Sequence, residues 1–432
     1  MLDEELAAAT ARRERPAVEG DNTDGDEPLR SRHDEVRDET ALGTERQAVR
    51  GVLDVATDED PTVGHETRGT DTQPGIRRIG ALRSPHRAGA QVTPVDLDPR
   101  MLPHRGHGTG HYTFRRVEVA AGRQFRLGDH VRQALADGRG VVALETTLIA
   151  HGLPSPENLE VARQLEQDVR DQGAEAATVG VVAGVATVGL SATEIERLAD
   201  PGGAVAKLSR RDLGVAVAAG VDGATTVAGT ITLAALAGIE VMATGGLGGV
   251  HRDAQKTWDV SADLETMRDV PILVVASGVK SVLDVAATLE RLETLGVPVV
   301  GYGTARFPGF YVSVTEHRLD WSVASPEEAA LAFAAHRRVA PGGMLLANPV
   351  APADELAPVR HDAALAEALR LAKAAHVSGK DVTPFLLARL AAATAGESVR
   401  VNRAIVRGNA VLAARIAVAL AAAPRPPRKT AS

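Results

Sequence analysis

The chain has 432 residues, 44% of them hydrophobic, and can therefore bury a large core in one domain or in roughly two to three smaller ones. It contains no cysteine, which excludes disulfides and thiolate zinc sites, and its formal net charge of −8 argues against a general nucleic-acid-binding protein. The acidic start does not resemble a secretory signal, and no apolar run approaches the roughly 18–20 residues of a membrane span, so we expect a cytoplasmic protein with neither nucleic-acid nor membrane partners.

Residues 1–120 differ in composition from the rest of the chain. No Phe, Trp or Tyr occurs before Tyr112, and mixed charges accompany frequent Gly, Pro and Thr. Such a segment cannot bury enough apolar surface to offset the entropy lost on ordering, so we predict a disordered extension over 1–120. The neighbouring His104, His107 and His111 fit a flexible polar stretch better than a metal clip.

A folded domain is predicted over 121–424, followed by a short tail over 425–432. Its first strong signal is the apolar run at 141–147, which has the composition of a buried strand. A Ser-Pro pair at 155–156 then predicts a helix with proline at its first position, and Gly173 ends that helix.

Strands and helices alternate over the following two hundred or so residues. Further apolar runs predict strands at 177–184, 204–208, 239–244, 271–277, 298–302 and 343–347. Polar caps predict helices that begin at Ser191 with Glu194, at Ser281 with Asp284, and at Ser325-Pro326 with Glu328. The last part, 361–422, reads as almost entirely helical, with helix starts at Thr383-Pro384 and Ser398. This alternation predicts an α/β fold, an α/β/α sandwich with a largely parallel central sheet and a helical C-terminal part.

Lysine is rare in this chain and is therefore informative where it occurs. Only six of the 48 basic residues are lysines, and the others are arginines. Arginine replaces lysine as a surface cation but does not deprotonate to form an imine. Lys207, near the end of one predicted strand, and Lys280, after another, are candidates for chemistry, whereas Lys373 and Lys429 are interpreted as surface residues.

Two clusters lie where ligands bind in α/β sheets, just beyond the carboxyl ends of strands. Glu145 follows the first buried strand and suits either a general acid or a carboxylate that caps a neighbouring helix. The segment 207–212 carries three cations and a hydroxyl, which suit a phosphate group. A surface turn in which Arg210 and Arg211 pair with Asp212 explains the same residues.

A glycine-rich segment at 244–252 forms the third cluster. Its four glycines let the backbone approach a ligand closely, but their spacing matches neither the dinucleotide fingerprint nor the P-loop. Asp259 and Asp263, with Ser261 between them, could serve a hard cation that keeps several water ligands. The alternative is a helix start in which these residues act as caps.

Lys280 is the fourth candidate. It follows the strand at 271–277 and precedes the helix predicted to begin at Ser281. The positive end of a helix dipole and partial burial both disfavour the ammonium form and favour the free amine that a Schiff base requires. The alternative is an exposed loop lysine.

These clusters, in this order, resemble the pseudouridine-5′-phosphate glycosidase family, also called the indigoidine synthase A-like family. The resemblance runs from about residue 125 to about residue 420 and rests on eight motifs. They are ETTLIAHGLPSPEN at 145–158, KLSRRDL at 207–213, TGGLGGVHR at 244–252, WDVSADL at 258–264, VASGVKSVLD at 275–284, GYGTARFPGFY at 301–311, LLANPV at 345–350 and VTPFLLARL at 382–390.

The resemblance implies an enzyme that reversibly cleaves the C–C glycosidic bond of pseudouridine 5′-phosphate to ribose 5-phosphate and uracil. It implies Glu145 as proton donor, Lys280 as the nucleophile that forms a Schiff base with ribose C1′, and Asp259 as the ligand of one Mn²⁺ ion. The implied sugar-phosphate contacts are Lys207, the backbone at Val227, and Ser261, Ala262 and Asp263. The residues implied to lie near the uracil are Thr244, His251 and Asn402. The family also implies a homotrimer.

Two other functions are compatible with the same clusters. One is a different Schiff-base enzyme acting on a sugar phosphate, such as a class I aldolase, which would use Lys280 without releasing uracil. The other is a non-catalytic sugar-phosphate sensor, which would need the pocket but not both Glu145 and Lys280.

Overall fold

The structure is a computed structural model that describes residues 124–377 and 379–423. The predicted extension over 1–120, with its three histidines, and the tail over 425–432 lie outside the described residues.

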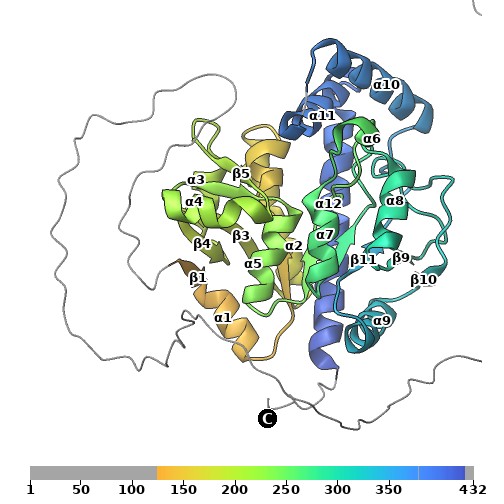
Figure 1. Ribbon diagram of the computed structural model, residues 1–432. Helices are drawn as coiled ribbons and strands as arrows, with labels where there is room; N and C mark the ends of the chain where they lie inside the picture. Colours follow the sequence, from red (N-terminus) through yellow and green to blue (C-terminus); the bar gives the residue numbers. More distant parts are fainter. Residues whose placement is uncertain (1–123, 378, 424–432) are drawn as a thin grey trace, which may run out of the picture. The chain divides into compact units, whose positions relative to one another are not determined.

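The described chain largely alternates strands and helices as far as β11 (Met344–Ala347) and then ends in three consecutive α-helices (Figure 1). The strands are β1 (Phe125–Leu127), β2 (Val141–Leu144), β3 (Glu175–Val182), β4 (Val185–Val188), β5 (Ala206–Leu208), β6 (Gly223–Thr225), β7 (Val241–Ala243), β8 (Leu273–Ala276), β9 (Val299–Tyr302), β10 (Trp321–Val323) and β11 (Met344–Ala347). The α-helices are α1 (Asp129–Ala136), α2 (Glu157–Asp171), α3 (Ala192–Ala199), α4 (Leu213–Ala219), α5 (Val227–Leu236), α6 (Ala254–Thr257), α7 (Ala262–Asp269), α8 (Val285–Thr294), α9 (Pro326–Val339), α10 (Pro358–Ala374), α11 (Val382–Ala393) and α12 (Glu397–Ala422).

One sheet of 11 strands runs through the molecule in the order β1-β4-β3-β2-β7-β8-β11-β9-β10, and β5 and β6 extend it beside β3. Along the run β3-β2-β7-β8-β11-β9-β10, every neighbouring pair of strands is parallel. On its other side, β3 pairs antiparallel with β4 and β6. The prediction of a largely parallel α/β sheet is therefore confirmed. The prediction missed β4, since Ala183 and Gly184 both take positive φ and turn the chain straight back into a hairpin.

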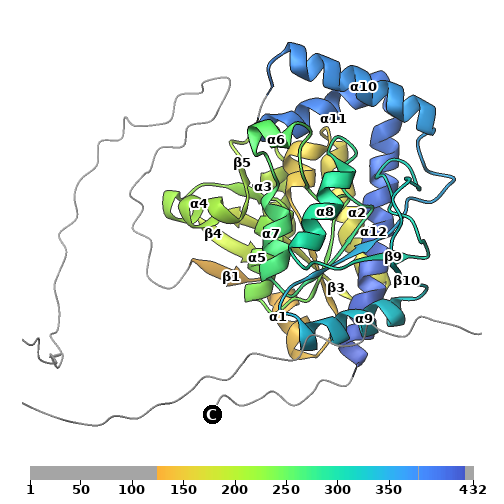
Figure 2. The same cartoon turned by 45° about the vertical axis from the view of Figure 1, so that its right-hand side comes forward.

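Successive residues of the central strands face opposite layers of the core. In β2, Val141 and Ala143 pack with α5, α7 and α8, whereas Val142 and Leu144 pack with α2, α9 and α12. Because both faces are apolar and covered by helices, the architecture is the expected α/β/α sandwich. Figure 2 shows α5, α7 and α8 in front of the sheet and α12 behind it.

Four predicted helix starts differ from the structure by one to four residues. The helix α11 begins at Val382, one residue before Thr383, and α12 begins at Glu397, one residue before Ser398. The first long helix, α2, has Pro156 as its N-cap, so proline does not occupy the first helical position. The helix predicted from Ser281 is α8, which begins at Val285 because the carboxylate of Asp284 accepts the N–H of Ala287. The starts of α3 at the Ser191 capping box and of α9 after Ser325 are confirmed.

The helix α12 departs from the expectation that no apolar stretch reaches membrane-spanning length. It is long and apolar enough to cross a membrane by length and composition alone, and it is the one such helix found among the described residues. Over its most apolar window, 56% of it is buried inside the fold, where it packs on α2, α9 and the central strands. These contacts are those of a core helix.

A helical hairpin covers one end of the sandwich. α10 and α11 lie beyond the end of α12 near α6 in both views (Figures 1 and 2). The hairpin packs its apolar side, including Leu365 and Leu386, into the core that contains α5, α7 and α8.

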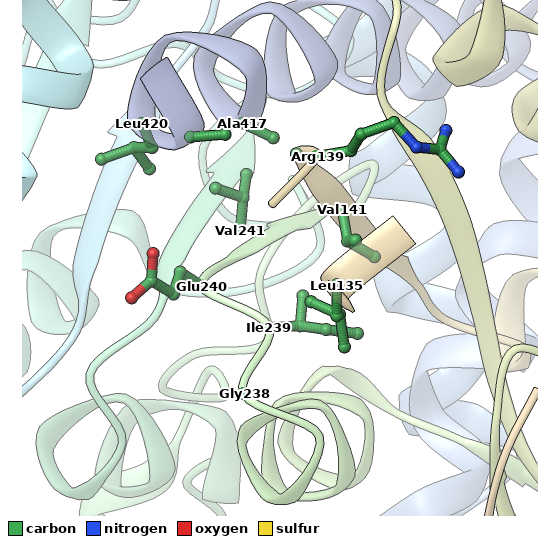
Figure 3. A pocket seen from close by; sticks show the side chains of 11 residues that line it. Leu135, Arg139, Val141, Gly238, Ile239, Glu240, Val241, Ala417 and Leu420 are labelled. Carbon is green, nitrogen blue, oxygen red and sulfur yellow. The ribbon is translucent and has the colours of Figure 1, made fainter. Parts of the chain in front are cut away.

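The opposite end of the sheet contains a gap of about 30 Å³ between α12 and the amino ends of β2 and β7 (Figure 3). Apolar side chains such as Ile239 and Leu420 line it, together with Gly140. Gly140 lies so close to α12 that a Cβ atom there would be 2.5 Å from the carbonyl carbon of Ala417.

We expect Gly140→Ala to destabilise the domain by about 1–3 kcal/mol, since the added methyl group meets helix backbone that cannot rotate away. Gly408→Ala is the matched control in α12, where no atom lies within 4 Å of an added Cβ, and should stabilise by about 0.5–1 kcal/mol. Equilibrium unfolding in urea measures both changes. Equal stability of the two variants would contradict this description of Gly140.

Candidate active site

The four clusters singled out in the sequence meet at the carboxyl edge of the sheet, around a cavity of about 460 Å³. All eleven site residues predicted from the sequence line this cavity: Glu145, Lys207, Val227, Thr244, His251, Asp259, Ser261, Ala262, Asp263, Lys280 and Asn402. Segments separated by more than two hundred residues thus supply the walls of one pocket.

Glu145 leaves the end of β2 and is half-buried in the cavity wall. The hydroxyl of Thr147 donates to one oxygen of its carboxylate, and the hydroxyl of Thr244 donates to the other. A threonine hydroxyl also accepts hydrogen bonds, so this pair can hold the carboxyl group in either protonation state. The arrangement suits a group that gives up and regains a proton, and gives no support to a helix cap.

Lys280 follows β8 but does not stand at a helix N-terminus, because α8 begins five residues later. The helix-dipole argument for this lysine is therefore wrong. Its position comes instead from backbone pairing, in which its N–H donates to the carbonyl of Leu247 and its Nζ donates to the carbonyl of Gly246. The side chain is half-buried and faces the cavity.

The glycines at 245–249 are explained mainly by close packing of protein atoms. A Cβ at Gly248 would lie 2.3 Å from the Ser261 hydroxyl, and one at Gly249 would lie 2.4 Å from the Thr288 hydroxyl. The N–H of Gly248 donates to Asp263 and is therefore not available to a ligand.

Asp263 joins two parts of the cavity wall. Its carboxylate is 5% exposed and accepts the backbone N–H groups of Ala228, in α5, and of Gly248. It thereby fixes the first turns of α5 and α7, which begin at Val227 and Ala262 and line the same cavity. Free N–H groups at helix starts favour anions such as phosphate.

Lys207 brings a positive charge to the same wall. Burial lowers the pKa of Lys207, and the charge of Lys280 lowers it further, while Asp263, Glu145 and Asp381 oppose the shift. The alternative was a surface turn in which Arg210 and Arg211 both pair with Asp212. Arg211 does lie 3.7 Å from Asp212, but Arg210 pairs instead with Asp269, at 2.6 Å.

The metal-ligating potential of the site is limited to few side chains. Nδ1 of His251 lies 3.7 Å from a carboxylate oxygen of Asp259. Burial lowers the pKa of His251; Asp259 opposes that shift, and Lys207 and Lys280 add to it. No group of three or more His, Cys, Asp or Glu able to hold a metal occurs over 124–377 and 379–423. The donor set therefore fits a hard cation held by Asp259 and several waters, and does not fit a protein cage.

Several wall residues were not singled out from the sequence. They include His151, Trp258, Phe310, Thr383, Pro384 and Leu387. His151 belongs to a short π-helix over Leu148–Gly152, a rare element that is frequent at functional sites. The available signals were the motifs themselves, since His151 lies inside the one at 145–158 and Thr383, Pro384 and Leu387 lie inside the one at 382–390.

The fold and cavity together define an α/β enzyme whose pocket holds two lysines and a carboxyl group. The chain belongs to the family described as indigoidine synthase A like protein, whose model matches residues 130–419. A pseudouridine-5′-phosphate glycosidase of Salinispora tropica is 56% identical over 309 residues, covering 71% of this chain and 95% of the relative. A pseudouridine-5′-phosphate glycosidase of Streptomyces griseus is 56% identical over 298 residues, which cover 68% of this chain and 92% of the relative.

Solved structures agree with this assignment. The prealnumycin C-glycosynthase AlnA, in complex with ribulose 5-phosphate, is 39% identical with a TM-score of 0.64, and the match covers 69% of this chain and 97% of that one. An indigoidine synthase A-like protein of Thermotoga maritima is 34% identical with a TM-score of 0.63, covering 73% and 100%. Membership in this enzyme family confirms the resemblance stated from the motifs.

Proposed function

We propose that this enzyme cleaves the C–C glycosidic bond of pseudouridine 5′-phosphate, reversibly, to give ribose 5-phosphate and uracil. The observation that carries the proposal is one cavity that contains Lys280, Lys207 and a carboxyl group, Glu145, held by two threonine hydroxyls. The relatives named pseudouridine-5′-phosphate glycosidase support the choice of substrate.

The proposed chemistry begins with the ribose ring. The amine of Lys280 attacks C1′ as the bond from C1′ to the ring oxygen breaks, and Glu145 delivers its proton to that oxygen. The new bond leaves the Lys280 nitrogen with an extra proton, which Glu145, now a carboxylate, takes up. The C1′–C5 bond then breaks as the freed nitrogen lone pair forms the imine, and the electron pair left on C5 takes the proton back from Glu145. Water adds to the imine and releases ribose 5-phosphate and free Lys280.

The phosphate group is proposed to lie between Lys207 and the first turns of α5 and α7. Val227, Ser261 and Ala262 lie at these helix starts, and Asp263 locks the two starts together. A lysine charge and helix N-terminal N–H groups are the usual donors to a phosphate. Thr244, His251 and Asn402 are proposed to contact the uracil.

Asp259 is proposed to be the side chain that would hold one Mn²⁺ ion, with waters as further ligands. When bound, the ion supplies Lewis acidity beside the phosphorylated sugar. A homotrimeric state and a cytoplasmic location are also proposed, from the family resemblance, and light scattering of the purified chain measures the former.

The test is incubation with pseudouridine 5′-phosphate, with and without Mn²⁺, while uracil is measured by ultraviolet absorbance and chromatography. Release of uracil with stoichiometric ribose 5-phosphate is expected. Absence of uracil under both conditions would rule out the proposed reaction. If borohydride still trapped a sugar phosphate on Lys280, another Schiff-base enzyme, such as an aldolase, would then be the better description.

The lowered pKa of Lys207 predicts the alkaline limb of the pH profile. As pH rises through that pKa, Lys207 loses its charge, and kcat/KM should fall about tenfold per pH unit. Lys207→Arg keeps its charge throughout this range and should lose the alkaline limb, while Lys207→Met should bind weakly at every pH. An unchanged alkaline limb in Lys207→Arg would contradict the assignment of phosphate binding to Lys207.

A further inference from the structure

A buried asparagine lies directly behind the cavity on the core helix α12. Asn409 is fully buried and stands two helical turns from Asn402, so both side chains lie on the same face of α12. Asn402 lines the cavity, whereas Asn409 does not. A fully buried amide is costly unless its donors and acceptor are all used.

Every polar atom of the Asn409 side chain has a partner at the end of a central strand. Its Nδ2 donates to the carbonyl of Thr244, after β7, at 2.8 Å and lies 3.2 Å from the Ser277 hydroxyl, after β8. Its Oδ1 accepts from Nδ2 of Asn348, after β11, at 2.9 Å. One amide thus ties together the carboxyl ends of three neighbouring strands.

The bond from Asn348 also fixes which way the amide points. Because Asn348 donates to Oδ1, the NH₂ group of Asn409 must face the β7 loop. Its second proton points toward the carbonyl of Gly245 as well, at 3.4 Å.

That loop orients both reacting groups of the proposed mechanism. Thr244, whose carbonyl accepts from Asn409, donates its own hydroxyl to Glu145. Two residues on, the Gly246 carbonyl accepts from Lys280 Nζ. A shift of Thr244 to Gly246 would therefore move the proton donor and the amine together.

We propose that Asn409 is a positioning residue, which sets the distance between Glu145 and Lys280 by donating a hydrogen bond to the β7 loop. The inference rests on the proposed function. It requires a donor at this position, because the groups facing Nδ2 are carbonyl oxygens and a hydroxyl.

The test uses Asn409→Asp in the full chain, after wild-type protein has been shown to release uracil. A protonated aspartic acid can donate to Thr244, but an ionised one repels its carbonyl. The ratio of variant to wild-type kcat should therefore fall by about ten- to a hundredfold between about pH 6 and about pH 9, with KM nearly constant. Asn409→Leu, which has no donor, should show the low kcat at every pH.

Melting temperatures recorded at each pH confirm that the variants remain folded. If Asn409→Asp does not fold, Asn348→Ala replaces it, since loss of the Asn348 donor frees the Asn409 amide to turn; kcat should then fall several-fold at constant KM. Wild-type kcat in Asn409→Leu, or in Asn348→Ala, would overturn the inference. Failure of wild-type protein to release uracil would instead overturn the proposed function.

Discussion

Lys280→Ala is expected to lower uracil release by about 10⁴-fold or more, because removal of a covalent nucleophile leaves no alternative route to the imine. The half-buried amine lies in the cavity wall and donates to the Gly246 carbonyl, so it is held in place before substrate enters. Steady-state assays with pseudouridine 5′-phosphate measure the loss, and borohydride reduction in the presence of ribose 5-phosphate should add the sugar-phosphate mass to wild-type protein only.

Lys280→Arg separates charge from nucleophilicity. Arginine keeps the cation but cannot lose a proton to form an imine, so this variant should be as inactive as Lys280→Ala and should not be trapped by borohydride. Lys373→Arg, at an exposed position on α10, is the matched control and should behave as wild type. Substantial uracil release by Lys280→Arg would show that the reaction does not pass through this amine.

The strand-end clusters could be predicted because they depend on local patterns. A polar residue at or just after the end of an apolar run identified Glu145, Lys207 and Lys280, and parallel strands bring such positions to one edge of the sheet. The rarity of lysine added weight to two of them. Mechanistic roles came from the family resemblance, since spacing alone left an alternative open for every cluster.

The features that sequence patterns missed depend on contacts between distant segments. In the sequence Asn409 does not stand out from the other polar residues of α12, among them Asn402 and several arginines, and its role is visible only when Thr244 and Asn348 are beside it. Ser281 has the residue type of a helix cap, yet its hydroxyl is buried without a partner among the described residues, and Asp284 caps the helix instead. The backbone N–H of Asp284 donates to the carbonyl of Val250, and this contact with a distant loop holds Asp284 at the start of the helix.

Glu145→Gln is expected to lower kcat by about 10²–10⁴-fold, the usual contribution of a general acid. Glutamine has nearly the same shape: its carbonyl oxygen can accept from one of the two threonine hydroxyls and its NH₂ group can donate to the other, so the cavity should keep its form. What it cannot supply is an acidic proton for the ring oxygen as the ribose opens.

Borohydride trapping should distinguish the loss of activity in Glu145→Gln from the loss of activity in the Lys280 variants. Free ribose 5-phosphate already contains open-chain aldehyde, so borohydride should still trap it on Lys280 in Glu145→Gln, although that variant hardly cleaves pseudouridine 5′-phosphate. Thr147→Val, which leaves Glu145 with the Thr244 hydroxyl alone, should retain most of the proton transfer and lose only about tenfold. Near-wild-type cleavage by Glu145→Gln would exclude Glu145 as the acid. Loss of trapping in the same variant would instead mean that this carboxyl group acts in forming the imine from the open aldehyde, and not only in opening the ring.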